Sequence, residues 1–332
     1  LLDFYYDRFD KNRQNAFTFK DYVEALNDFS ESSTYKEDKD YWMEQISLIP
    51  PAPMLPLQKD PSVIRKPQFA RIEKVIPKSE WNVLQKEAKK KGITTSTLLC
   101  TAYALVLGYW SNQPELTINV TVFTRYPFNE GVTDIVGDFT SVILLRVNLL
   151  GRSDFWKLAS EIQNQLMDAL EHRHYDGMNV IRKIAEQAEM KEQAVMPVVF
   201  TSLLFSMEEG DIVTIEDLGE VKMGVSQTSQ VYLDYQVMET KEGLLITWDY
   251  IKELFTPNMI STMFKQYINI VESLSKNVIS MPHLDSKEQE VFTAYNDTKL
   301  DMPILPIQTT FKKIAEKYPE KILIADNTGG VT

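Results

Sequence analysis

The 332-residue chain is 44% hydrophobic and 25% charged, the composition of a globular protein long enough for about two domains. Its formal net charge of −12 argues against a nucleic-acid partner, because phosphates are neutralised by clustered Lys and Arg side chains. One cysteine, three scattered histidines and the lack of an apolar run of about 18 residues argue against a disulfide framework, a zinc site and a membrane span.

The first 47 residues predict helices, and prolines follow them. Apolar side chains recur at helical spacing in residues 1–29, and residues 36–47 predict a charged helix. Four prolines lie between Pro50 and Pro56, which neither a helix nor a central strand tolerates. We therefore expect a stiff, extended connector between two lobes.

Strands and helices alternate after this connector. The patterns predict strands at 69–76, 117–123, 140–149 and 198–205 and helices at 79–91, with Ser79 as N-cap, 95–110, 155–170 and 178–189. Residues 231–237 and 244–250 flank Gly243 and predict a hairpin, and Thr256-Pro257 predicts the start of a last helix. This mixture indicates an α/β two-layer sandwich.

The sequence changes character near its C-terminal end. Residues 285–310 are polar and interrupted by prolines, which predicts a linker. An amphipathic helix at 311–318 and a strand at 322–325 follow. This tail is too short to fold alone, so we expect it to begin a further domain.

Thr201 introduces a hydroxyl into an apolar strand. It shares a strand face with Val199 and Leu203, and a buried hydroxyl needs a hydrogen-bond partner. A threonine bonded to nearby backbone explains the residue as well as a catalytic role does.

Asp234 lies in mid-strand between aromatic residues. Alternation places it with Tyr232 and Gln236 on one strand face, opposite Leu233 and Tyr235. A solvated edge residue is one interpretation. The other is a general acid or base whose pKa is set by partial burial.

Arg125 follows the predicted strand 117–123, and Asp138 precedes the predicted strand 140–149. The sequence allows a structural ion pair between them at the strand ends.

Taken in order, these segments resemble the heterocyclization variant of the condensation domains of nonribosomal peptide synthetases, over roughly residues 1–283. The motifs that carry the resemblance are residues 55–57, 95–111, 120–125, 135–141, 199–202, 226–234 and 248–249. Residues 311–325 look like the opening of an adenylation domain.

The resemblance implies two chloramphenicol-acetyltransferase-like lobes. This chain would contain the end of the N-terminal lobe (1–47), an inter-lobe linker (48–66), the complete C-terminal lobe (67–283), a second linker (284–310) and the start of an adenylation domain (311–332).

The resemblance also implies a reaction. A carrier-bound acyl or peptidyl thioester condenses with carrier-bound Cys, Ser or Thr, and cyclodehydration then gives a thiazoline or oxazoline. The implied partners are upstream and downstream peptidyl carrier proteins, whose phosphopantetheine arms enter as substrates, and the adjoining adenylation domain. No directly bound cofactor or metal is expected, and the location is cytoplasmic.

Asp234 matches the family's catalytic aspartate and Thr201 its hydrogen-bonding threonine. Ring closure needs a base for the nucleophile's proton and an acid for the departing hydroxide. Our hypothesis is that Asp234 transfers protons while Thr201 positions the carbonyl oxygen or the leaving water. Supporting, substrate-binding residues are expected at Thr124, Arg125, Asp138, Ser202, Gln227 and Gln236.

Two features depart from the family pattern. Thr124 stands where the family usually has asparagine, and the paired-aspartate motif Asp-x4-Asp-x2-Ser does not occur in residues 1–29. We therefore expect the chain to be part of a longer polypeptide and to be inactive alone.

Three other functions compete with this one. A condensation-only domain would form plain peptide bonds, and a catalytically inactive domain would serve as a docking scaffold for carrier proteins. A stand-alone acyltransferase is the third, although the adenylation-like tail disfavours it.

Overall fold

The computed structural model describes residues 17–151, 154–189, 194–204, 223–276, 278–283, 286–299, 306–322, 324–326 and 329–331. The chain divides into two compact units, Leu1–Pro282 and His283–Thr332. The helical pattern expected before residue 17 and the Phe205 end of the fourth predicted strand lie outside the described residues.

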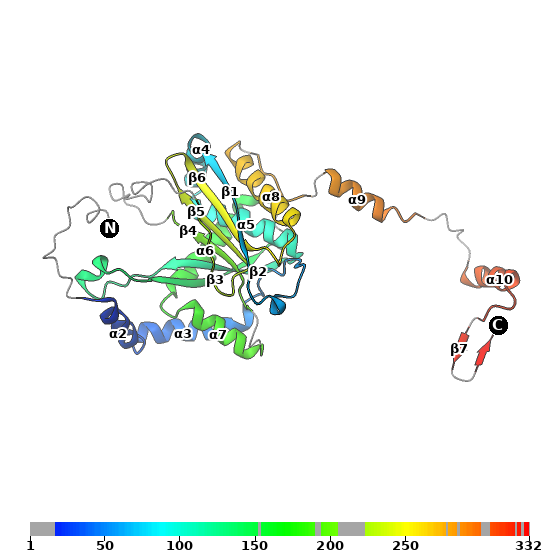
Figure 1. Cartoon of the computed structure of the whole chain (residues 1–332), viewed down its shortest axis with the longest axis horizontal. Helices are drawn as coiled ribbons and strands as arrows, with labels where there is room; N and C mark the ends of the chain where they lie inside the picture. Colours follow the sequence, from blue (N-terminus) through cyan, green and yellow to red (C-terminus); the bar gives the residue numbers. More distant parts are fainter. Residues whose placement is uncertain are drawn as a thin grey trace. The chain divides into compact units, whose positions relative to one another are not determined.

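A six-stranded mixed sheet forms the centre of the first unit (Figure 1). Its order is β1-β6-β5-β4-β2-β3; β4 pairs in parallel with β2 and β5, and the other neighbours are antiparallel. The strands are β1 (Phe69–Pro77), β2 (Glu115–Phe123), β3 (Thr140–Asn148), β4 (Val198–Ser202), β5 (Leu233–Glu239) and β6 (Gly243–Ile251).

The predicted hairpin is confirmed as β5 and β6. Gly243 begins β6 with φ +146°, a conformation that favours glycine. A Cβ atom there would lie 2.1 Å from the carbonyl oxygen of Ile76 on the neighbouring strand. Glycine therefore lets β6 pair closely with β1.

One face of the sheet is apolar. A register row across it holds Ile72, Trp248, Tyr235, Phe200, Val120 and Ile143, all of which belong to one hydrophobic cluster. The helices that pack with the sheet and with one another are α4 (Lys78–Lys90), α5 (Thr95–Ser111), α6 (Phe155–Glu171) and α8 (Pro257–Ser275) (Figure 1). This helix layer on a sheet confirms the predicted α/β sandwich.

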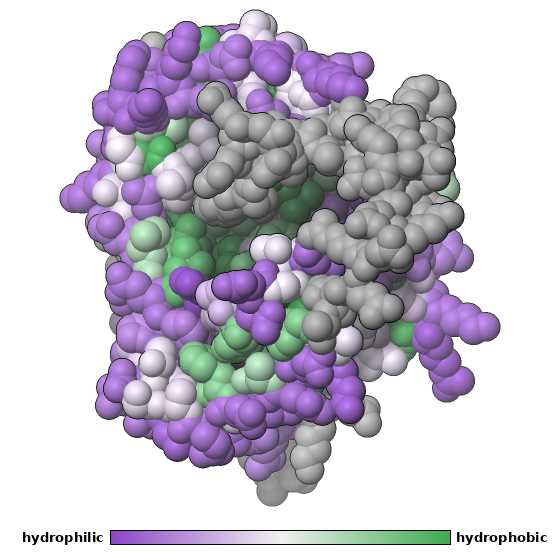
Figure 2. Space-filling view, turned by 90° about the vertical axis from the view of Figure 1, so that its left-hand side faces the viewer, coloured by the Kyte–Doolittle hydropathy of each residue, from purple (hydrophilic) through white to green (hydrophobic). Residues whose placement is uncertain are grey.

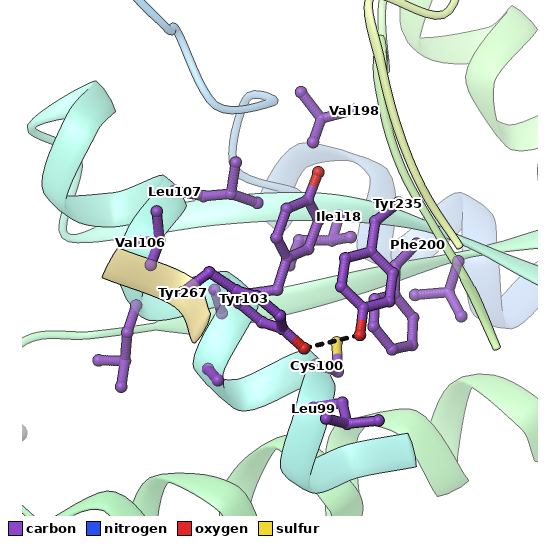
Figure 3. Packing of buried hydrophobic residues seen from close by; sticks show 14 of the residues in the cluster. Leu99, Cys100, Tyr103, Val106, Leu107, Ile118, Val198, Phe200, Tyr235 and Tyr267 are labelled. Atoms are coloured by element: carbon purple, nitrogen blue, oxygen red, sulfur yellow. Dashed lines mark hydrogen bonds between the residues drawn. The ribbon is translucent and has the colours of Figure 1, made fainter. Parts of the chain in front are cut away.

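Helix α5 lies at the centre of that core and is buried from Ser96 to Gly108. Figure 3 shows the hydroxyls of Tyr235 (β5) and Tyr267 (α8) bonded to each other at 2.6 Å, close to the Cys100 thiol. Burial raises the pKa of Cys100 to about 12, so the thiol stays protonated. Cys100 is a core residue, as its apolar neighbours in the sequence indicate.

Helices α2 (Phe19–Phe29), α3 (Ser33–Gln45) and α7 (Gly177–Gln187) are the remaining α-helices described in this unit, with short 3₁₀ turns η1 (Ile46–Leu48), η2 (Pro61–Val63) and η3 (Glu130–Asp134). Helix α2 packs its Tyr22 against Val132, Ile135 and Phe139 of the connection between β2 and β3, residues 124–139. The Tyr22 hydroxyl donates to the Thr124 carbonyl oxygen at 2.9 Å. Helix α2 therefore holds this connection in place.

The structure tests the predicted N-caps of two helices, α8 and α4. Thr256 caps α8 as predicted, its hydroxyl oxygen accepting from the Met259 N–H. Ser79 does not cap α4, because that helix begins at Lys78, directly after the last residue of β1, with Pro77 as N-cap. The strand runs straight into the helix and leaves no position for a serine cap.

The second unit contains α9 (Ser286–Asn296), α10 (Ile307–Lys317) and an antiparallel pair, β7 (Ile324–Asp326) and β8 (Gly329–Val331). The helix predicted at 311–318 begins earlier, at Ile307. Helix α9 lies inside the range predicted as a linker, because Glu, Gln, Lys and Ala there favour helix despite the polar composition.

Candidate functional site

The sheet face opposite the helix layer carries polar side chains on consecutive strands. One register row holds Arg71, Asp249, Asp234, Val199 and Asn119. The next row, two residues along each strand, holds Glu73, Thr247, Gln236, Thr201 and Thr121. We call this the polar face.

Asp234 is buried on the polar face, with 7% of its surface exposed. Its Oδ2 accepts a hydrogen bond from Gln236 Nε2 at 2.8 Å. Its Oδ1 is buried and has no hydrogen-bond partner among the described residues. Asp234 is therefore a buried carboxyl with one oxygen that has no hydrogen bond among the described residues, and not the solvated edge residue that the sequence also allowed.

Burial raises the pKa of Asp234 above its ordinary value. Hydrogen bonds from Gln236 and Ser226 oppose that shift, the charge of Asp249 adds to it, and the charge of Arg71 opposes it. The carboxyl is thus easier to protonate than one in water, which suits a group that must both accept and return a proton.

Asp249, directly across from Asp234 on β6, is 1% exposed. Arg71 donates to both of its oxygens, from Nε to Oδ1 at 2.8 Å and from Nη2 to Oδ2 at 2.6 Å. The Ser226 N–H donates to Oδ2 at 2.6 Å. Asp249 therefore fastens the segment that precedes β5 to the sheet beside Asp234.

Thr201 is half-buried and lies on the same face. Its hydroxyl donates to the Thr121 hydroxyl oxygen at 2.8 Å, so its partner is a side chain of β2. Two hydroxyls carry two hydrogens, and this bond uses one of them. The pair therefore keeps one O–H that is able to donate to a bound carbonyl.

The parallel pairing of β4 and β5 brings Thr201 and Asp234 together. Thr201 is opposite Gln236, and Gln236 is the residue that donates to Asp234. Thr201 is thus the diagonal neighbour of Asp234 across one strand gap of about 4.8 Å. Three strands, β2, β4 and β5, therefore place one hydroxyl pair beside one carboxyl.

Two predicted supporting residues lie elsewhere. Ser202 points into the opposite face, where its hydroxyl bonds with that of Ser96 at 2.7 Å, because successive side chains of a strand alternate. Gln227 is exposed in the segment before β5. The structure brings Gln236 to Asp234, but neither Ser202 nor Gln227.

The other three predicted supporting residues, Thr124, Arg125 and Asp138, lie in the connection 124–139. The Thr124 N–H donates to the Phe139 carbonyl oxygen at 2.8 Å. Arg125 Nη1 donates to the carbonyl oxygens of Val132 and Thr133, and its guanidinium lies 3.9 Å from the Phe139 ring centre.

The predicted ion pair between Arg125 and Asp138 is wrong. Asp138 is exposed and accepts the Thr140 N–H at 2.9 Å, and hydrogen bonding by Thr140 lowers its pKa. The arginine instead satisfies carbonyl groups of the turn that it encloses. Its role is to shape the connection between β2 and β3.

The connection also exposes apolar surface. Val136 in the connection is 96% exposed, and Phe123, the last residue of β2, is 55% exposed, although both are large hydrophobic residues. Figure 2 shows a face of the molecule on which hydrophobic residues lie in a hollow between hydrophilic ones. Contiguous apolar surface is typical of an interaction site, whereas single exposed hydrophobic residues are common on globular proteins.

Sequence reasoning assigned no role to six polar residues of this face, although two of them, Thr121 and Asp249, lie in motifs that carry the resemblance: Arg71, Glu73, Asn119, Thr121, Thr247 and Asp249. Alternation in Glu115–Phe123 was the available signal, because Ile118, Val120 and Val122 face the core and leave Asn119 and Thr121 on the other side. Arg71 gave no signal, since its partner lies 178 residues away.

No group of three or more His, Cys, Asp or Glu side chains within the described ranges is arranged to hold a metal ion. No single described helix is long and apolar enough to cross a membrane; α4 and α5 meet that test only as a pair bent by 98°.

Known proteins are similar to this chain in sequence and in structure. The model of the condensation domain family matches residues 2–300. Bacitracin synthase 1 of Bacillus licheniformis is 38% identical over 310 residues, which are 93% of this chain and 6% of that protein. Phenyloxazoline synthase MbtB of Mycobacterium tuberculosis is 31% identical over 259 residues, which are 76% of this chain and 18% of that protein. The chain thus spans a small part of these relatives.

Among solved structures, the cyclization-docking bidomain of the nonribosomal peptide synthetase EpoB from Sorangium cellulosum is similar, with a TM-score of 0.75 and 32% identity. The match covers 84% of this chain and 56% of that one.

Proposed function

The chain belongs to the condensation domain family, and from this premise we propose that it forms a five-membered heterocycle during nonribosomal peptide synthesis. The substrates are a carrier-bound acyl or peptidyl thioester and a carrier-bound Cys, Ser or Thr. Condensation gives an amide, and cyclodehydration converts it to a thiazoline or oxazoline. The names of a phenyloxazoline synthase and a cyclization bidomain among the similar proteins support this proposal.

The observation that carries the proposal is the pairing of a buried carboxyl with a hydroxyl pair. Asp234 has one oxygen without a partner among the described residues, and Thr201 and Thr121 keep one hydroxyl hydrogen between them. Ring formation needs a proton acceptor that becomes a proton donor, together with a donor for a carbonyl oxygen. The polar face offers both within neighbouring strands.

Condensation comes first. The amine nitrogen attacks the thioester carbonyl carbon, a C–N bond forms, and the C–S bond breaks. The sulfur leaves as the thiol of the upstream phosphopantetheine arm, and the amine loses one proton.

Ring closure follows on the new amide. The side-chain thiol or hydroxyl adds to the amide carbonyl carbon, and Asp234 carries its proton to the carbonyl oxygen, which becomes a ring hydroxyl. The C–O bond then breaks as the C=N bond forms, and Asp234 carries the proton of the nitrogen to the departing hydroxide. One water is released overall.

Thr201 has the second role in this proposal. With Thr121 it donates to the carbonyl oxygen on which negative charge develops during attack. Gln236, bonded to Asp234 and opposite Thr201, keeps the carboxyl turned toward that oxygen.

We further propose that the chain acts within a multidomain synthetase in the cytoplasm. Its partners there are upstream and downstream peptidyl carrier proteins, whose phosphopantetheine arms bring both substrates, and an adjoining adenylation domain. No bound cofactor is needed, because every step is a proton or acyl transfer. The relatives, of which this chain covers 6% and 18%, are long enough to hold such partners.

The test replaces Asp234 by asparagine, which keeps its shape and removes its proton transfer. The intact synthetase receives loaded donor and acceptor carrier proteins, and the mass of the carrier-bound product is measured with time. We expect the open-chain amide to accumulate in Asp234→Asn, with ring formation slowed by roughly 10²- to 10⁴-fold.

Asp40→Asn is the matched control, because it changes an exposed carboxyl on helix α3 of the same unit and should leave the ring yield unchanged. A normal ring yield from Asp234→Asn contradicts the assigned role. Wild-type product that never loses water would indicate condensation alone.

A further inference from the structure

Two buried carboxyls face each other on the polar face. Asp234 on β5 and Asp249 on β6 are direct register partners, and they are 7% and 1% exposed. Residues directly opposite in an antiparallel pair have Cβ atoms about 4.5–5.5 Å apart, and like charges in that position repel each other. The proposed reaction uses Asp234 and gives Asp249 no chemical step, so the buried pair calls for an explanation.

The two carboxyls are held differently. Asp249 accepts two hydrogen bonds from the Arg71 guanidinium, at 2.8 and 2.6 Å, and one from the Ser226 N–H at 2.6 Å. Asp234 accepts from the neutral Gln236 amide at 2.8 Å, and its Oδ1 has no partner among the described residues. A cation and hydrogen bonds stabilise an ionised carboxyl. Asp249 therefore carries the fixed negative charge, and Asp234 is the carboxyl that exchanges a proton.

Distance decides which charge acts more strongly on Asp234. The register row runs Arg71, Asp249, Asp234, so the anion is one strand gap of about 4.8 Å away and the cation is two gaps away. Coulomb energy falls with distance, so the nearer negative charge dominates. The raised pKa of Asp234 agrees with this order: burial contributes most to it, and the charge of Asp249 adds more than the charge of Arg71 subtracts.

Few other charged groups face Asp234 among the described residues. Glu73 of β1 lies in the next register row and is exposed. Tyr103 of α5 lies behind the sheet, where burial and then the Asp234 charge raise its pKa. The rows of Asp234 and Gln236 contain no charged residue on β4 or β2, and neither does the described segment 223–232. Asp249 and Arg71 are thus the charges that matter.

We propose that Asp249 is a positioning residue for ring closure that acts through Asp234: anchored by Arg71, it presents a fixed negative charge that makes Asp234 a stronger proton acceptor. An aspartate in water is a weak base, and a general base works best when its pKa lies near the pH of the reaction. Asp249 brings Asp234 closer to that condition. This inference rests on the proposed function, because it assumes that Asp234 transfers protons during ring closure.

The test measures the pH dependence of ring closure on the intact synthetase, as the rate at which the carrier-bound open-chain amide loses water. The rate should fall in acid, where Asp234 is already protonated. Asp249→Asn keeps the shape of the side chain and removes its charge, so the midpoint of this fall should move to lower pH by about 1 unit. Arg71→Met removes the cation and should move the midpoint the other way, by about 0.5 unit.

Three controls separate charge from structure. Arg71→Lys keeps the cation and loses the two-point bond, so it should keep the wild-type midpoint even if the rate falls. The exposed Asp40→Asn should change neither the midpoint nor the rate. The double variant Arg71→Met/Asp249→Asn should have a midpoint between those of its two single variants. It replaces Asp249→Asn if that variant does not fold, because it leaves no unpaired buried charge, and its midpoint should still lie below that of the wild type.

A wild-type midpoint in Asp249→Asn, with only the rate reduced, overturns the proposal, because Asp249 would then be a structural anchor alone. A second measurement does not depend on ring formation. In urea unfolding at neutral pH, the factor by which Asp234→Asn lowers the unfolding equilibrium constant should be about 10-fold smaller in the Asp249→Asn background, since one pH unit corresponds to a factor of ten. An equal factor in both backgrounds also overturns the proposal. A synthetase that makes only open-chain amide refutes heterocyclization and leaves this measurement intact.

Discussion

Replacing Arg71 by methionine should destabilise the first compact unit by about 3–5 kcal/mol, because it leaves the Asp249 carboxylate buried without its cation. The substitution removes two charge-assisted hydrogen bonds, of 2.8 and 2.6 Å, and keeps the Ser226 N–H bond of 2.6 Å. Each lost bond contributes roughly 1.5–3 kcal/mol, which agrees with the total. The like charge of Asp234 across the strand pair adds to the effect.

Urea unfolding followed by tryptophan fluorescence measures this change. Lys183→Met is the control, because it breaks an ion pair with Glu186 whose two side chains are 44% and 64% exposed, and such pairs contribute under about 1 kcal/mol. The double variant Arg71→Met/Asp249→Leu should recover most of the loss, since no unpaired charge remains. Equal stability of Arg71→Met and Lys183→Met would refute the reasoning.

Two further predictions concern buried carboxyls. Burial raises the pKa of Asp234 above its ordinary 3.8, so folding favours the protonated carboxyl. The folded protein therefore loses stability relative to the unfolded chain as pH rises from 3.8 through that raised pKa. Asp234→Asn should therefore be more stable than the wild type at neutral pH, and thermal unfolding should show the gain vanish as pH falls below 3.8; a gain that persists in acid contradicts this sign. Asp38 accepts the His174 N–H at 2.8 Å and faces Nδ1 of both His172 and His174, so it joins α3 to the turn after α6. Asp38→Asn should reduce the free energy of unfolding by about 1–3 kcal/mol, whereas the exposed Asp40→Asn on the same helix should change it by less than about 0.5 kcal/mol; similar losses in both would argue against this buried anchor.

The sequence by itself determined what depends on near neighbours. Alternation along a strand placed Asp234 on one face with Tyr232 and Gln236, and Thr201 on one face with Val199 and Leu203, because side chains of a strand point to opposite sides in turn. The proline after Thr256 fixed the start of α8, and Gly243 marked the β5–β6 hairpin. Where two elements join directly, as at Pro77, the same local signals misplaced a helix cap.

Tertiary structure alone decided which polar residues meet. The order β6-β5-β4-β2 brings residues 249, 234, 201 and 121 onto adjacent strands, and no local pattern encodes that order. Burial is decided in the same way, because Asp234 is buried beside Asp249, to which the segment before β5 is hydrogen-bonded. Hydrogen-bond partners, burial and the pKa shifts that follow from them depend on contacts between residues far apart in the chain, so only the folded sheet determines them.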